Sequence, residues 1–236
     1  MREFLIGASI LTAYIMISIV AAVAVQRLSG ISSEALRKTL HFILLGAYIP
    51  LTLGFSVWWH AAIFACLLLA LTYPFLLIVN RVPLLSGLLV ERWRGEYLSS
   101  MMMALCTMAL VTYICWGGFG DRYLLIASVY AWGIGDGVAA LVGRRFGRHK
   151  ISFAFADPHK SAEGSLAMLT ASVVSVFVVL LMRGGMPFAV CLFISLVAGC
   201  AVTLCEMCAR NGFDTVLCPL ASMAVILPLV SFFSGR

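Results

Sequence analysis

The sequence predicts an all-α protein, a polytopic transmembrane helical bundle of about eight spans that forms a single integral membrane domain over residues 1–236. Its residues are 63% hydrophobic and only 11% charged, whereas charged residues make up about a quarter of an ordinary soluble domain. Apolar stretches of about 20 residues recur along the whole chain, and each can cross the hydrocarbon layer as a helix. Helices are favoured there because backbone polar groups in lipid must be satisfied within each segment.

The expected membrane helices follow from the mean hydropathy of windows of about 19 residues. They lie at 4–25, 40–57, 61–79, 98–116, 123–142, 165–182, 187–207 and 215–232. Trp58, Trp59 and His60 predict a tight turn between the second and third helices, because aromatic rings with a polar edge favour the headgroup level. The segment 81–97 predicts an interfacial loop or a short helix.

The distribution of lysine and arginine predicts the orientation of the chain. Twelve of the 16 basic residues follow the first, third, fifth and seventh expected helices, and four lie on the other side. Cytoplasmic loops carry the basic excess, so both termini should face away from the cytoplasm. Cleavage of a signal peptide near 22–24 is a rival interpretation, but it would place the basic loops on the wrong face. Topology thus explains the net charge of +6, and we expect the lipid bilayer, not nucleic acid, as a partner.

Eight cysteines mostly lie inside the apolar segments. Free cysteine behaves there as a small hydrophobic residue. We therefore expect no structural disulfide or metal site among them, the Cys205/Cys208 pair included.

The chemically informative segment runs from Trp132 to Met168, and its first unusual residue is Asp136. This aspartate lies inside an apolar helix, where an ionisable group is costly and usually functional. The alternative is a structural polar group satisfied by its neighbours. Gly133, Gly135 and Gly137 surround it and allow close approach by a helix, a metal or a phosphate.

A basic cluster follows at the end of the same expected helix. Gly143 and Gly147 bracket Arg144 and Arg145, and Lys150 comes next. The basic side chains suit a polyphosphate, although contact with anionic lipid headgroups explains them equally well. The two glycines have GxxxG spacing, which helix packing alone can explain.

The polar loop before the next helix supplies acidic partners that the topology does not explain. It holds Asp157, Lys160, Ser161 and Glu163. Ser161 is a candidate helix cap or phosphate donor at a helix start, where exposed amides favour anions. Asp136, together with the two acidic residues of the loop, is a candidate ligand of a hard cation such as Mg²⁺.

Two further groups lie on the same predicted face of the membrane. Arg37, Lys38 and His41 begin the second helix, where they either add to the anion site or anchor the topology. Glu206 and Asp214 place acidic side chains at the end of the seventh helix and the start of the eighth. No GxxxxGK[ST] phosphate loop is present, so a nucleotide site has to be assembled at the membrane interface.

Four motifs, taken in order, carry a resemblance to a known family. They are RKTLH at 37–41, GDGVAALVGRRFG at 135–147, KSAEGSLA at 160–167, and a glutamate followed by NGFDTVLCPL at 211–220. Together they resemble the CTP-dependent polyprenol kinase family, which contains dolichol kinase, phytol kinase and the CTP-using diacylglycerol kinase. The last motif of that family often has Asp-Asn, whereas this chain has Asp214-Thr215.

The resemblance implies transfer of the γ-phosphoryl group of CTP to the hydroxyl of a membrane lipid alcohol, with release of CDP. Asp136 with Asp157 or Glu163 would then hold Mg²⁺ or accept the hydroxyl proton, and the basic cluster with Lys160 would bind phosphates. Phytol, a polyprenol or dolichol, and diacylglycerol are all open as substrates. The implied site is on the cytoplasmic face, of the plasma membrane in a prokaryote or of the endoplasmic reticulum or plastid in a eukaryote.

Two other functions compete with this interpretation. Phosphatidate cytidylyltransferase is also polytopic and uses CTP, but its terminal motif with Pro-Gly-His-Gly-Gly is missing from this sequence. A small transporter should show polar groups near the bilayer midplane and repeat symmetry. The charged residues here gather at one interface instead, which favours chemistry at that face.

Overall fold

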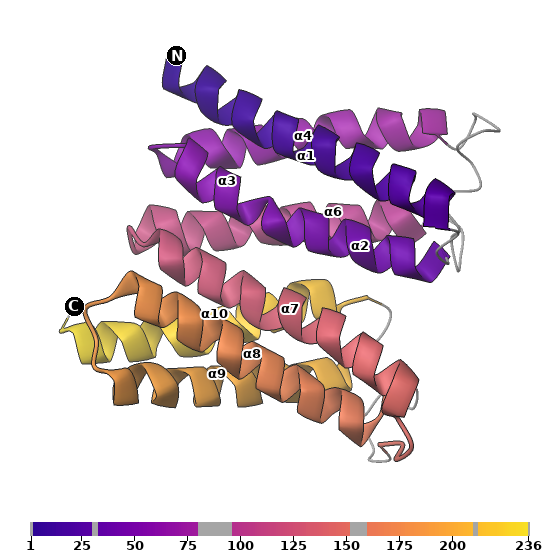
Figure 1. Ribbon diagram of the computed structural model, residues 1–236. Coiled ribbons are helices and arrows are strands. Elements are labelled where there is room, and N and C mark those ends of the chain that lie inside the picture. The colour runs from indigo at the N-terminus through magenta and orange to yellow at the C-terminus, as the bar shows by residue number, and fades with distance from the viewer. Residues whose placement is uncertain (1, 30–32, 80–95, 152–159, 210–211, 236) are drawn as a thin grey trace. The chain divides into compact units, whose positions relative to one another are not determined.

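The computed structural model describes residues 2–29, 33–79, 96–151, 160–209 and 212–235. The elements assigned within these ranges are helices (Figure 1), so the all-α prediction is confirmed. The helices fall into two compact units, Met1–Tyr113 and Ile114–Arg236, which are described in turn. The single-domain organisation stays a prediction.

Helices long and apolar enough to cross a membrane occur in both units, and the chain is an integral membrane protein. Five are found among the described residues: α1 (Arg2–Ser29), α7 (Arg122–Phe146), α8 (Ala162–Arg183), α9 (Phe188–Cys208) and α10 (Asp214–Ser234). Shorter apolar helical stretches at Lys38–Gly54, Trp58–Leu68 and Met102–Gly118 coincide with the other predicted segments. The predicted polytopic bundle is confirmed.

The first unit contains α1 with α2 (Ser33–Gly46), α3 (Tyr48–Gly54), α4 (Trp58–Val79) and α6 (Glu96–Val111). Helix α1 packs against α2 and α3, and α4 packs against α6. A Cβ atom on Gly7 would lie 2.4 Å from the carbonyl oxygen of Gly54, so glycine permits this close approach of α1 and α3.

Two details of the first unit differ from the prediction. The expected helix 40–57 is broken between α2 and α3, because Pro50 has no N–H and its ring clashes with the carbonyl of Gly46. The expected turn at Trp58–His60 is wrong, since these residues begin α4 and the bend lies just before them. Most of the predicted loop 81–97 is outside the described residues.

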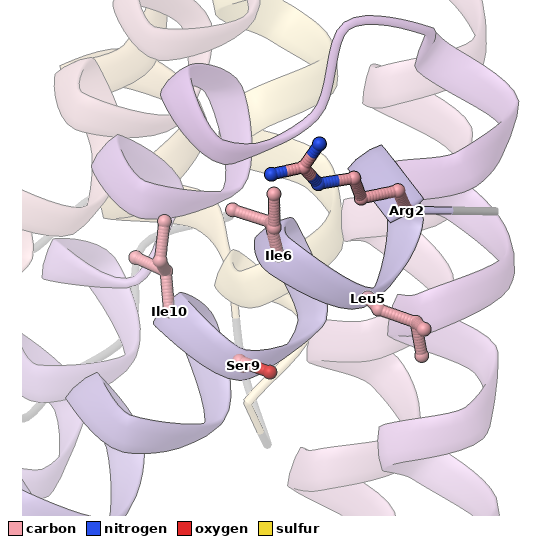
Figure 2. A pocket seen from close by; sticks show the side chains of 5 residues that line it. All are labelled: Arg2, Leu5, Ile6, Ser9 and Ile10. Carbon is pink, nitrogen blue, oxygen red and sulfur yellow. The ribbon is translucent and has the colours of Figure 1, made fainter.

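An open pocket of about 470 Å³ lies along the beginning of α1 (Figure 2). Its lining residues all come from that one helix: Arg2, Leu5, Ile6, Ser9 and Ile10. The lining is apolar apart from one serine and one arginine, and it contains no carboxylate. This pocket therefore lacks the paired charges that phosphate chemistry requires.

The second unit begins in the π-helix η1 (Thr112–Gly118) and continues through α7, α8, α9 and α10. Helix α8 packs on α7 and α9, and α10 packs on α9 and α7. Small residues let α7 and α8 approach closely: a Cβ atom on Gly135 would lie 2.5 Å from the hydroxyl oxygen of Ser172. The Ser172 hydroxyl donates to the carbonyl oxygen of Ala131 at 2.6 Å, which adds a polar contact between the helices.

Successive helices of this unit run in opposite directions (Figure 1). The end of α7, the start of α8, the end of α9 and the start of α10 therefore lie at the same end, which we call the charged end. At the opposite end, Arg183 Nε lies 2.6 Å from Asp121 Oδ2 and joins α8 to the start of α7. Asp121 also caps α7 by accepting from the amide of Tyr123.

Candidate functional site

Two short segments between α7 and α8, residues 149–151 and 160–162, pair with each other at the charged end, and we call them the neck. The amide of Ile151 donates to the carbonyl oxygen of Lys160 at 3.1 Å, and the amide of Ala162 donates to that of His149 at 2.9 Å. An antiparallel bridge pairs Lys150 with Ser161. Lys150 and Lys160 are thereby held at the start of α8, whereas Asp157 lies outside the described residues.

A largely buried ion pair joins the neck to α9. Lys160 Nζ lies 2.6 Å from Glu206 Oε1, and the exposed fractions of the two side chains are 19% and 9%. The same ammonium group donates to the main-chain oxygen of Glu206. Burial of a carboxylate is costly unless a cation accompanies it, so Lys160 and Glu206 stabilise each other here.

Two more carboxylates act on this ion pair from other helices. Asp136 of α7 and Asp214, the first residue of α10, both interact electrostatically with Glu206. Each of these two aspartates is half-buried. Three of the predicted acidic residues, on α7, α9 and α10, thus interact with one another around the Lys160–Glu206 ion pair.

This set of residues fits a divalent cation that is shared with a phosphate ligand. Among the described residues, no three His, Cys, Asp or Glu side chains are grouped to hold a metal by themselves. Mg²⁺ is usually bound through one or two carboxylates plus substrate phosphates. The carboxylate oxygens of Asp136, Glu206 and Asp214 are ligands of that kind.

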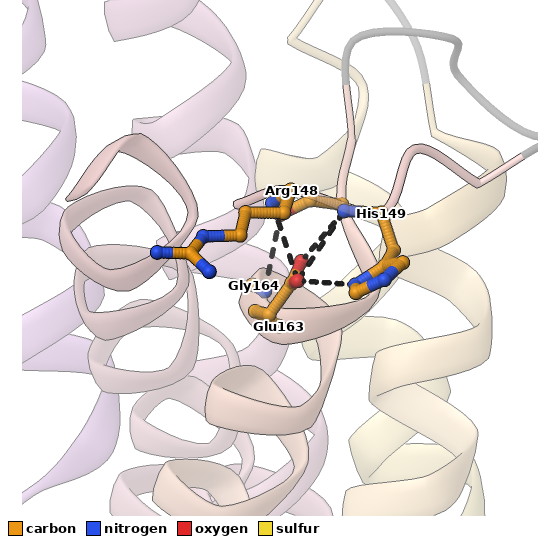
Figure 3. A network of polar contacts seen from close by, with 5 residues as sticks. Arg148, His149, Glu163 and Gly164 are labelled. Carbon is orange, nitrogen blue, oxygen red and sulfur yellow. Dashed lines mark hydrogen bonds and ion pairs between the residues drawn. The ribbon is translucent and has the colours of Figure 1, made fainter. Parts of the chain in front are cut away.

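Glu163 has a different environment from the other acidic residues (Figure 3). Its Oε1 accepts from the amides of Arg148 at 3.2 Å and His149 at 3.3 Å. The Nδ1 atom of His149 lies 2.8 Å from the same oxygen. The carboxylate thus ties the first turn of α8 to the neck, and its predicted role as a metal ligand stays a prediction.

Ser161 and the predicted glycines lie at the contact between α7 and α8. The buried hydroxyl of Ser161 accepts from the amide of Gly164 at 3.2 Å and caps α8. A Cβ atom would lie 3.3 Å from this hydroxyl if built on Gly143 and 2.7 Å from it if built on Gly147. This placement fits the helix-packing interpretation, and phosphate binding by these residues and by Gly135 stays a prediction.

The predicted basic residues Arg144, Arg145 and Lys150 are all exposed at the charged end. Arg144 and Arg145 belong to the last turn of α7, where cations also favour the helix dipole. They can therefore meet a polyphosphate that approaches Lys160 from water.

The RKTLH motif belongs to α2 in the first unit. Lys38 and His41 are half-buried there, and the ring of His41 lies 6.0 Å from that of Phe42. The side chain of Arg37 is outside the described part of the chain. A contribution of this motif to the charged end stays a prediction.

Comparison with known proteins identifies the family. The chain is 32% identical to phytol kinase from Synechocystis sp. (strain ATCC 27184 / PCC 6803 / Kazusa), over 93% of this chain and 90% of that protein. The chain belongs to the phytol and polyprenol kinase family. No family model and no solved structure matches it. The identity extends over nearly the whole chain, so the assignment does not depend on a single motif.

In this member of the family, residues of the last three motifs come from α7, the neck before α8, α9 and α10, and they lie in the second unit. The contacts of Arg148 and His149 with Glu163 did not follow from the motifs, because they depend on how the chain re-enters α8. The sequence did hold one hint of these contacts, because Arg148 and His149 follow closely after the end of α7 and so lie near the same end of the unit. Their backbone amides, which any residue supplies, carry most of this contact.

Proposed function

We propose that this chain is a CTP-dependent kinase of a membrane lipid alcohol. The γ-phosphoryl group of CTP moves to the lipid hydroxyl, which yields a lipid monophosphate, CDP and one proton. The observation that carries the proposal is the 32% identity to phytol kinase over nearly the whole chain. Phytol and related isoprenoid alcohols are therefore the first substrates to test, and the motif resemblance supports CTP as the donor.

The ion pair suggests how the site receives the nucleotide. Phosphoryl transfer depends mainly on positioning and charge neutralisation. Lys160 is held at the charged end by Glu206, and a triphosphate brings several negative charges that compete with this carboxylate for the ammonium group. Arg144, Arg145 and Lys150 supply further positive charge, so we assign these four basic residues to phosphate binding.

Asp136 is the carboxylate best placed to accept a proton from the hydroxyl of the lipid. It precedes Phe146, the last residue of α7, by ten positions, which is about 15 Å along a helix. Asp214, by contrast, is the first residue of α10. The lipid hydroxyl enters from the membrane side, so we assign Asp136 as the acceptor of its proton.

Asp214 and the phosphates of the nucleotide would hold Mg²⁺, and Asp157 is a further predicted ligand. When bound, the cation supplies neutralisation of phosphate charge. The protein contributes the position of the carboxylates and of Lys160. By the distribution of basic residues, the charged end faces the cytoplasm, where the nucleotide is available.

An assay with purified protein tests this function. The protein is incubated with Mg²⁺, γ-labelled CTP, ATP, GTP or UTP, and phytol, farnesol, dolichol or diacylglycerol. We expect labelled lipid monophosphate with CTP and an isoprenoid alcohol. Transfer to none of the alcohols would refute the kinase, and transfer from ATP in preference to CTP would refute the assigned donor.

A further inference from the structure

Cys205 of α9 and Cys218 of α10 lie near the charged end, where these two helices pack against each other. Cys218 Sγ lies 3.9 Å from the carbonyl oxygen of Val202, one turn before Cys205. Side chains on a helix lean towards the preceding turn, which places the Cys205 side chain over the same carbonyl. The Cys205 and Cys218 side chains accordingly lie on the surfaces by which α9 and α10 pack, and the two thiols interact electrostatically.

This pair adjoins the ion pair of the proposed kinase. Cys205 immediately precedes Glu206, and it also interacts electrostatically with Lys160 and Asp214. The side chain of Cys205 is partly exposed, whereas Cys218 is buried, and both are free thiols. A small oxidant can therefore reach Cys205 before it reaches the buried Cys218.

We propose that Cys205 and Cys218 form a redox modification site at which a peroxide produces a disulfide between α9 and α10. The Cys205 sulfur attacks one peroxide oxygen, the O–O bond breaks, and a sulfenic acid and one water form. The Cys218 sulfur then attacks the sulfenic sulfur, which forms the S–S bond and releases a second water. The two thiols are oxidised by two electrons in total, and the peroxide is reduced by two.

The disulfide changes the geometry of the neighbouring ion pair. A disulfide requires an S–S distance of about 2.05 Å, which is shorter than any non-bonded contact between two sulfur atoms. We expect closure of this distance to draw the last turn of α9 towards α10 and to shift Glu206 with it. We expect this movement to weaken the position of Lys160 and to reduce kinase activity at least tenfold.

Peptide mapping tests the disulfide without reference to catalysis. The full chain in lipid nanodiscs is treated with hydrogen peroxide, its remaining thiols are alkylated, and linked peptides are identified by mass spectrometry. We expect a Cys205–Cys218 link in the wild type and in the matched control Cys208→Ser, but not in Cys218→Ala. Absence of this link from the wild type, or a dominant Cys205–Cys208 link, overturns the proposal.

Activity of the same samples tests the consequence. Peroxide should lower wild-type lipid phosphorylation at least tenfold, dithiothreitol should restore it, and Cys218→Ala should keep its activity in peroxide. An unchanged activity despite a complete Cys205–Cys218 link would refute the regulatory effect. The inference goes beyond the proposed kinase function, because the linked peptide forms whether or not the substrates are correctly assigned.

Discussion

The ammonium nitrogen of Lys160 lies 2.6 Å from Glu206 Oε1, although 46 residues separate the two in the sequence. This contact joins the neck before α8 to the end of α9, and Asp136 and Asp214 add negative charge around it. A lysine in this position stabilises a buried carboxylate and also presents a cation where a triphosphate can bind. The two roles can be separated by substitution.

Removal of Lys160 alone should damage both stability and nucleotide use. Lys160→Ala leaves Glu206 without its cation, which should lower the free energy of unfolding by about 3 kcal/mol. The double variant Lys160→Met/Glu206→Gln removes both charges and should recover most of this stability. Thermal unfolding in detergent and the KM for CTP are the measurements. The double variant should still have a KM at least tenfold higher than the wild type, and a wild-type KM would contradict phosphate binding by Lys160.

Substitution of Asp136 should affect turnover without preventing folding. Asp136→Asn keeps the size of the side chain but removes the proton acceptor, so kcat should fall at least a hundredfold at saturating Mg²⁺. Asp121→Asn is the control at the start of the same helix, because Asp121 caps α7 and pairs with Arg183 at the opposite end. The control should lose thermal stability and keep the KM of the wild type. Full turnover by Asp136→Asn would remove the base assignment.

The contacts of Glu163 predict a positioning role. Glu163→Ala removes the acceptor for the amides of Arg148 and His149, so hydrogen exchange should accelerate in residues 148–151. The KM for CTP should rise about three- to tenfold because Lys160 lies in the same neck, while the Mg²⁺ concentration for half-maximal activity should not change. A large shift in that Mg²⁺ concentration would instead identify Glu163 as a cation ligand, as the sequence suggested.

The close contact at Gly147 predicts a steric effect. A Cβ atom there would lie 2.2 Å from the carbonyl oxygen of Gly143, which is backbone and cannot move away cheaply. Gly147→Ala should therefore destabilise the protein by about 2 kcal/mol. Leu141→Ala, at an exposed position of the same helix, is the control and should change stability little. Equal melting temperatures for both variants would show that α7 does not end as described.

Hydropathy predicted most of the helical architecture because membrane spans must be both long and apolar. It did not predict where a span is interrupted, since an apolar window reports composition and not backbone continuity. Pro50 was the visible signal for the break after Gly46. The contact of the Tyr14 hydroxyl with the carbonyl oxygen of Ile43, which lies beside this break, depends on the packing of α1 and could not be predicted locally.

The ionisable residues at the charged end were predictable from the sequence, but the residues that they contact were not. Asp136, Lys160, Glu206 and Asp214 follow from motifs and from a common membrane face. The pairing of Lys160 with Glu206 depends on the neck and on the packing of α9. The cysteine pair is similar: Cys208 is the nearer residue along the chain, but the antiparallel packing of α9 and α10 places Cys218 near Cys205.

The proposed reaction is transfer of a phosphoryl group to a lipid alcohol at this charged end. CTP labelled either at the α- or at the γ-phosphorus, incubated with the purified protein and phytol, tests it most directly. We predict that only the γ-label enters the lipid and that Lys160→Met/Glu206→Gln greatly reduces this transfer. Entry of the α-label into lipid, with release of pyrophosphate, would contradict it and indicate a cytidylyltransferase.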